Sequence, residues 1–171
     1  MILRVLAVGL LLVTAALLQT ALFPFLTLAG FRPDLLLLVT VAVGLHDGPL
    51  PGLRVGFAAG LLTDLLVTQS PVGIAVLITT VTGFVVGLAR PYLAPESVTA
   101  PVIIAFVTGL LGTAGYGVLA LLLGEERIAP VMLLQASVAV GLYNTVLAPL
   151  ALIAVRRLSD RFPLTGPGLL D

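Results

Sequence analysis

Residues 48–64, GPLPGLRVGFAAGLLTD, decide how the rest of the chain is interpreted. Glycines recur in this stretch at positions 48, 52, 56 and 60, among apolar residues, and the stretch ends at Asp64. In water such a helix is poor, because each interior glycine costs about 1 kcal/mol relative to alanine. In a bilayer, close backbone approach at small residues is a main source of helix packing. The stretch therefore predicts a transmembrane helix with a glycine face for a neighbouring helix.

The composition of the whole chain agrees with a membrane setting. Its 171 residues are 60% hydrophobic and 9% charged, and the mean hydropathy is +1.24. These values are typical of an integral membrane protein and not of a soluble domain. A formal net charge of +0 gives no basic field that would attract nucleic acid. The absence of Cys and the single His exclude disulfides and a multi-His or Cys metal site within one chain.

Six apolar segments separated by polar or Pro/Gly-containing turns predict an all-α membrane protein with six transmembrane helices in one integral membrane domain, residues 1–171. The second apolar run, Leu35 to Leu45, is too short to span a bilayer, so we expect a short helix that starts near one interface. The first run is too long for a signal peptide, and further spans follow it. The helices are expected at about 5–23, 33–45, 52–68, 72–89, 98–123 and 130–155, with a tail over 156–171.

The arginines predict the orientation of these spans. Six helices would place Arg32 and Arg127 on one side of the membrane and all other arginines on the opposite side. Because arginine accumulates in cytoplasmic loops, both termini are expected in the cytoplasm and the chain in the cell inner (cytoplasmic) membrane as a multi-pass protein. The arginines of the cytoplasmic side are Arg4, Arg54, Arg90, Arg156, Arg157 and Arg161.

Three charged residues are expected to form a polar layer near the outer surface: Arg32, Asp34 and Asp64. Asp64 lies about 15 Å along the helix from Arg54, which places it about one turn below that surface. An acid at this depth is costly unless it is paired, hydrated or protonated. Two alternatives stay open for Asp64: an acid wetted from the short outer turn, or an acid that pairs with Arg32 or with a donor on a partner.

The glycines are expected to form helix-packing or partner-binding faces. Gly52, Gly56 and Gly60 share one face of their helix, and Asp64 flanks that face because successive i+4 positions drift by about 40°. Gly83 and Gly87 offer a similar face on the next helix. Whether the neighbour at these faces is an internal helix or a partner's helix is left open.

The polar residues of the remaining spans favour packing over chemistry. Gln135 and Asn144 are expected to face opposite sides of one helix, and each is interpreted as an interhelical hydrogen bond. The only His, His46, falls in a cytoplasmic turn, so a Ser/His dyad within the membrane is not expected. We therefore predict a protein that is not an enzyme, with no catalytic, metal-binding or cofactor-binding residues.

The order of these features resembles one known family. Residues 31–66 contain Pro33-Asp34 followed by a leucine run, a short Gly-Pro turn, the glycine-spaced helix and Asp64-Leu65-Leu66. The turn Ser70-Pro71-Val72-Gly73 then leads into a helix with Gly83. Together they resemble the rod shape-determining protein MreD family, although the turn at His46-Asp47 lacks the basic residues expected there.

The resemblance implies a non-enzymatic subunit of the bacterial elongation machinery that helps maintain rod shape and direct lateral peptidoglycan synthesis. Its implied partners are the bitopic protein MreC, through a lateral transmembrane contact, and indirectly MreB, RodA and a class B penicillin-binding protein. The implied fold is similar to substrate-binding subunits of energy-coupling-factor transporters. The alternative function is a small-solute-binding membrane subunit of a transporter. Self-association into a homodimer is left open.

Overall fold

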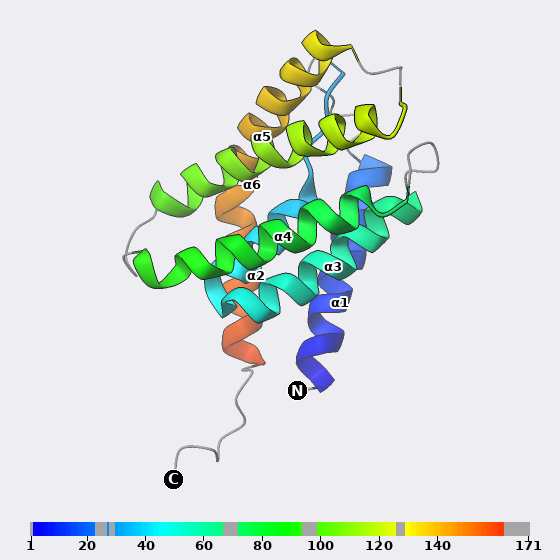
Figure 1. Ribbon diagram of the computed structural model, residues 1–171. Coiled ribbons are helices and arrows are strands. Elements are labelled where there is room, and N and C mark those ends of the chain that lie inside the picture. Colours follow the sequence, from blue (N-terminus) through cyan, green and yellow to red (C-terminus); the bar gives the residue numbers. More distant parts are fainter. Residues whose placement is uncertain are drawn as a thin grey trace.

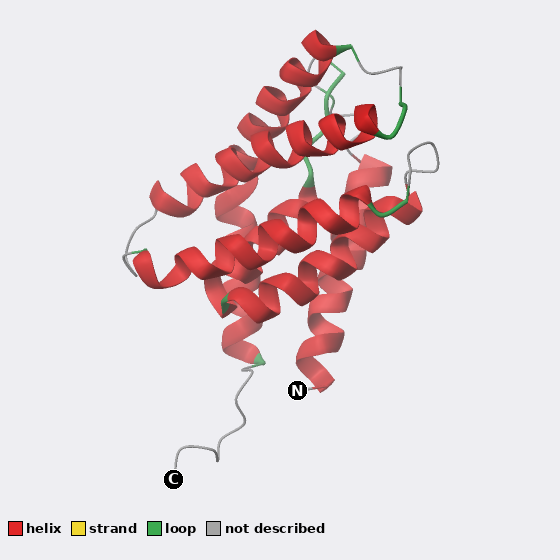
Figure 2. Ribbon diagram, viewed as in Figure 1, coloured by secondary structure: helices red, strands yellow, loops and turns green. Residues whose placement is uncertain are grey.

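The computed structural model describes residues 2–22, 27, 30–66, 72–93, 99–125 and 129–162, and these form helices and connecting loops without a strand (Figure 2). Arg127, residues 67–68 of the third predicted helix and the predicted tail beyond residue 162 lie outside the described residues. The elements are α1 (Ile2–Leu17), the π-helical turn η1 (Leu18–Leu22), α2 (Leu35–Asp47), α3 (Pro49–Leu66), α4 (Ile74–Ala89), the 3₁₀ turn η3 (Arg90–Tyr92), α5 (Thr99–Leu122) and α6 (Pro130–Arg161).

Several predicted helix bounds are wrong. α1 begins at Ile2, before the predicted residue 5, and α2 continues through His46 and Asp47, which were expected in a turn. α3 begins at Pro49, because Gly48 makes the whole turn from α2 with a φ of 96° and proline suits the first position of a helix. α6 continues to Arg161, beyond the predicted end at 155. Its last turns are buried on one side at Val155 and Ser159, and the arginines beside them favour a helix C-terminus.

α2 is the central helix of the bundle. Every residue from Leu36 to Leu45 is buried, and α2 contacts α1, α3, α4, α5 and α6. Figure 1 shows α2 in the interior, behind α3 and α4 in this view. A helix that is apolar on all sides can be surrounded by lipid or by protein, and the burial of α2 shows that other helices surround it. The shortness of α2 therefore reflects enclosure by protein, and its length of about 20 Å leaves it about 10 Å shorter than the hydrocarbon core of a bilayer.

Glycines bring α2, α3 and α4 together. A Cβ at Gly44 of α2 would lie 2.8 Å from the Gly83 carbonyl oxygen of α4. A Cβ at Gly52 of α3 would lie 2.9 Å from the Gly44 Cα and also 2.9 Å from the Gly83 carbonyl carbon. Side chains are thus excluded where the three backbones meet, and the close approach supplies packing in a setting without hydrophobic driving force.

Length and hydropathy together indicate which helices can cross a membrane. Four segments of the described residues are both long and apolar enough, and α2 is a shorter apolar helix. The chain is therefore an all-α membrane protein, whereas the prediction of six crossings stays a prediction. The four segments are Ile2–Ala21, Ile74–Tyr92, Thr99–Leu122 and Pro130–Arg161.

The two ends of the described chain lie at the same end of the bundle (Figure 1). Arg4 near the start of α1 donates from Nη1 to the Phe162 carbonyl oxygen just after α6, at 2.7 Å. This arrangement agrees with termini on one side of the membrane, and it sets the polar groups described next at the opposite end of α1 and α2.

Candidate functional site: the start of α2 and its cavity

The first turn of α2 is capped by side chains from two elements. Gln19 of η1 accepts from the backbone N–H groups of Leu35 (2.9 Å) and Leu36 (3.3 Å) through Oε1. Asp34 accepts from the Leu37 N–H through Oδ1 at 3.0 Å. The Leu38 N–H closes the first helical bond to the Asp34 carbonyl oxygen at 3.0 Å. The free donors of a helix start, which are costly without water, are thereby all satisfied.

Asn144 of α6 completes this junction. Its Oδ1 accepts from the Asp34 backbone N–H at 3.2 Å, and the side chain is only 1% exposed. The predicted interhelical hydrogen bond at Asn144 is thus confirmed, whereas Gln135 is exposed and the prediction for it is wrong. The Asn144 Nδ2 is buried without a partner and faces α5 at Gly109. α2 therefore starts against the middle of α6, well inside the bundle.

Asp64 caps a different helix. Its carboxylate accepts backbone N–H donors from Gly73 (2.8 Å), Ala75 (3.2 Å) and Val76 (3.1 Å) at the start of α4. The residue is 5% exposed, so it is not a wetted surface acid. A carboxylate is favourable at a helix N-terminus because of the partial positive charge there. The donors to Asp64 come from its own chain, and no ion pair with Arg32 forms among the described residues.

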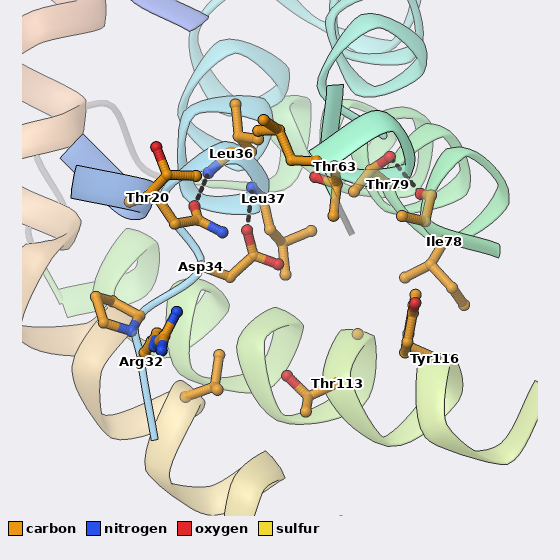
Figure 3. A pocket seen from close by; sticks show the side chains of 16 residues that line it. Thr20, Arg32, Asp34, Leu36, Leu37, Thr63, Ile78, Thr79, Thr113 and Tyr116 are labelled. Atoms are coloured by element: carbon orange, nitrogen blue, oxygen red, sulfur yellow. Dashed lines mark hydrogen bonds between the residues drawn. The ribbon is translucent and has the colours of Figure 1, made fainter. Parts of the chain in front are cut away.

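A cavity of about 420 Å³ lies at the start of α2. Figure 3 shows the Asp34 carboxylate projecting into it, with Arg32 on one side and the α5 side chains Thr113 and Tyr116 across from α2. Its wall is mixed: apolar side chains from α2, α3 and α4 alternate with polar ones. The polar residues on this wall include Gln19, Arg32, Asp34, Thr63, Thr113 and Tyr116. A cavity of this size with a few convergent polar groups has the features of a small-ligand site.

The charged groups of the cavity are not paired with each other. These groups are Arg32 and Asp34, and Pro33, which lies between them in the sequence, is buried with less than 2% of its surface exposed. Arg32 is exposed at the cavity and takes part in no ion pair within the described part of the chain. The Thr113 and Tyr116 hydroxyls also have no hydrogen-bond partner among the described residues. The cavity therefore presents an unpaired cation, an acid and two free hydroxyls.

The predicted polar layer is thus only partly one site. Arg32 and Asp34 line the cavity together, whereas Asp64 does not line it. The structure turns Asp64 toward α4, and only its neighbour Thr63 reaches the cavity.

The predicted glycine faces lie inside the chain. A Cβ at Gly56 would lie 2.8 Å from the Thr79 carbonyl carbon, and one at Gly60 would lie 2.6 Å from the Val76 backbone nitrogen. A Cβ at Gly87 would lie 2.5 Å from the Pro49 nitrogen. The Thr79 hydroxyl lies 2.7 Å from the Gly56 carbonyl oxygen. α4 therefore fills the glycine face of α3, and that face is closed to a partner's helix.

A buried ion pair at the opposite end was not found from the sequence. Arg4 donates through Nη2 to Asp47 Oδ2 and to the Ser159 hydroxyl (2.7 Å), and the exposed fractions of the Arg4 and Asp47 side chains are 4% and 7%. His46 Nδ1 lies 2.9 Å from Asp47 Oδ1. The sequence predicts Arg4 only as a positive charge on the expected cytoplasmic side, and nothing local in the sequence joins it to a residue at the end of α2.

The described residues contain no group of three or more His, Cys, Asp or Glu side chains that would hold a metal ion. The polar groups at the start of α2 instead offer hydrogen-bonding and ionic contacts.

Comparison with known proteins gives one match. The family model for rod shape-determining protein MreD matches residues 1–158. No curated protein and no solved structure matches the chain, so the similarity to energy-coupling-factor transporter subunits stays a prediction.

Proposed function

The chain belongs to the MreD family of rod shape-determining proteins, and from this premise we propose that it is a non-enzymatic membrane scaffold of the cell-wall elongation complex. Family membership gives it a role in rod shape determination. In this proposed role the chain lies in the cytoplasmic membrane with six crossings, binds the transmembrane helix of MreC and helps to direct lateral peptidoglycan synthesis. MreB, RodA and a class B penicillin-binding protein would be reached through MreC.

The observation that carries the MreC contact is a groove between α4 and α5. Its volume is about 590 Å³, and its walls are almost entirely apolar. Along α4 it runs from Leu77 to Ala89, which is about 18 Å or three helical turns. The exposed side chains that flank it are Leu77, Val81 and Val85 on α4 and Ile103, Val107 and Leu111 on α5.

The groove suits a single apolar helix. Thr82, Thr108 and Gly112 line it, and small residues of this kind let transmembrane helices approach closely. The Thr108 hydroxyl donates to the Ile104 carbonyl oxygen at 2.7 Å, so it needs no partner from the groove. Because α4 already fills the glycine face of α3, the groove is the better place for a lateral contact with MreC.

Cross-linking tests this docking site directly. The chain has no cysteine, so single cysteines can be placed without background. In membranes that contain MreC with cysteines along its transmembrane helix, Val81→Cys and Val107→Cys are expected to cross-link to MreC. Val146→Cys, exposed to 74% on α6, is the matched control and is expected not to. Cross-links at Val146 alone would place MreC elsewhere, cross-links between two copies would favour a homodimer, and failure of MreC to co-purify would overturn the scaffold.

The second candidate function is a small-solute-binding subunit of a transporter. One observation favours it, namely the partly polar cavity at the start of α2. A small molecule that copurifies with the chain, together with uptake of its radiolabelled form into proteoliposomes, would support transport. Absence of such uptake in proteoliposomes, together with MreC binding, supports the scaffold.

A further inference from the structure

Beyond the N-terminal turn of α2 no helix of the described residues occupies the centre of the bundle, and the cavity lies at this place. α2 is about 10 Å shorter than the hydrocarbon core, and the cavity begins at its N-terminal turn. α5 supplies the opposite wall through Thr113 and Tyr116. Polar groups at such a depth are costly unless they are satisfied, so unpaired ones in a membrane protein are a signal of function.

The charges of the cavity are separated into two poles. At one pole, Asp34 uses Oδ1 to accept from the Leu37 N–H, and no hydrogen bond among the described residues occupies its Oδ2. At the other pole stands Arg32, which pairs with no acid there. The buried Pro33 holds the backbone between these two residues, so they face the same cavity without neutralising each other.

We propose that this cavity binds a small zwitterionic group, with its ammonium on Asp34 and its phosphate or carboxylate on Arg32. An ammonium satisfies the free oxygen of Asp34, and charge-assisted hydrogen bonds of this type are the strong ones. The guanidinium of Arg32 matches the planar geometry of an oxyanion. The Thr113 and Tyr116 hydroxyls add donors for the remaining oxygens of the ligand.

Phosphoethanolamine has this chemistry, and it reaches a membrane protein either as a lipid headgroup or in a soluble compound. The volume of about 420 Å³ holds a headgroup-sized ligand. The cavity and the α4–α5 groove share Ile78 and Gly112 in their walls, whereas Arg32 and Asp34 line the cavity and not the groove, so variants at these two residues test ligand binding without changing the groove.

The first experiment measures retained lipid. The full chain is reconstituted into nanodiscs of phosphatidylglycerol with added phosphatidylethanolamine, extracted, and examined by native mass spectrometry. Selective retention of phosphatidylethanolamine is expected, and Asp34→Asn and Arg32→Gln are each expected to reduce it at least about tenfold. Asp34→Asn keeps the cap of α2, because asparagine caps helices as well as aspartate does. Arg156→Gln, at an exposed residue near the other end of α6, is the control.

The second experiment separates the two sources. The chain in pure phosphatidylglycerol nanodiscs is titrated with glycerophosphoethanolamine. Saturable binding that both variants lose identifies a soluble ligand, whereas selective lipid retention without such binding identifies the headgroup. Equal retention of both lipids, equal retention in the variants and the native chain, or no response in either experiment would overturn the proposal. Circular dichroism at 222 nm verifies that each variant is folded.

Discussion

Gly52 of α3 and Gly83 of α4 meet backbone to backbone. A Cβ at Gly83 would lie 2.7 Å from the Gly52 carbonyl carbon, and a Cβ at Gly52 would lie 2.9 Å from the Gly83 carbonyl carbon. The contact is reciprocal, so neither helix has room for a side chain at this position. It brings α4 against α3 and leaves the other side of α4 to form the groove with α5.

Alanine at Gly52 is therefore expected to destabilise the bundle. The added methyl group has backbone on both sides, and overpacking of this kind costs about 1–3 kcal/mol. The melting temperature of Gly52→Ala in detergent should fall, as measured by circular dichroism because the chain has no tryptophan. The control is Gly9→Ala, since nothing lies within 4 Å of a Cβ at Gly9 of α1. A Gly52→Ala protein as stable as the Gly9→Ala protein would contradict the packing.

Asp64 provides a test of capping against ion pairing. Asp64→Asn keeps one acceptor for the α4 donors and loses the charge, whereas Asp64→Ala removes the acceptor of the Gly73, Ala75 and Val76 N–H groups. We expect Asn to cost less than Ala, with a loss of about 1–3 kcal/mol for Ala. Thermal unfolding of both variants measures this order, and Asp160→Asn at an exposed position of α6 is the control. Equal losses for Asn and Ala would show that the charge dominates.

The sequence allowed prediction of six helices and of the residues at the glycine faces, because apolar runs and four-residue spacing are local signals. It did not reveal that α2 is central, since lipid-facing and protein-facing helices are equally apolar. The Asp64 cap was also hidden, because an acid that caps a helix usually stands next to its start. Asp64 instead lies on the preceding helix and reaches α4 across a turn.

Only some of the residues that line the cavity could be predicted from the sequence. Arg32 and Asp34 are neighbours in the sequence, so their proximity was predictable. Thr113 and Tyr116 come from α5, far along the chain, and threonine or tyrosine in an apolar helix gives no sign of what it faces. Tertiary packing decided these members of the site.

The Arg4–Asp47 ion pair is expected to hold together the start of α1 and the ends of α2 and α6. Arg4→Gln or Asp47→Asn alone leaves the other charge buried, which typically costs about 3–5 kcal/mol. The double variant should be less destabilised than the sum of the single ones, because it leaves neither charge unpaired. Thermal unfolding of the three variants gives the coupling energy, with Arg157→Gln at an exposed residue as the control. Additive losses would mean that the pair contributes no coupling.

Gln19 offers the sharpest test of the α2 cap, because the chain contains a matched control. Gln19→Leu removes the acceptor for the Leu35 and Leu36 N–H groups, and each unsatisfied donor costs about 1–3 kcal/mol in an apolar setting. Gln135→Leu makes the same change at an exposed residue of α6 and should leave stability unchanged or raise it in lipid. In thermal unfolding, only Gln19→Leu should lower the midpoint. Hydrogen exchange followed by mass spectrometry should then locate the faster-exchanging amides at the start of α2, and faster exchange elsewhere would contradict the role of Gln19 as the cap.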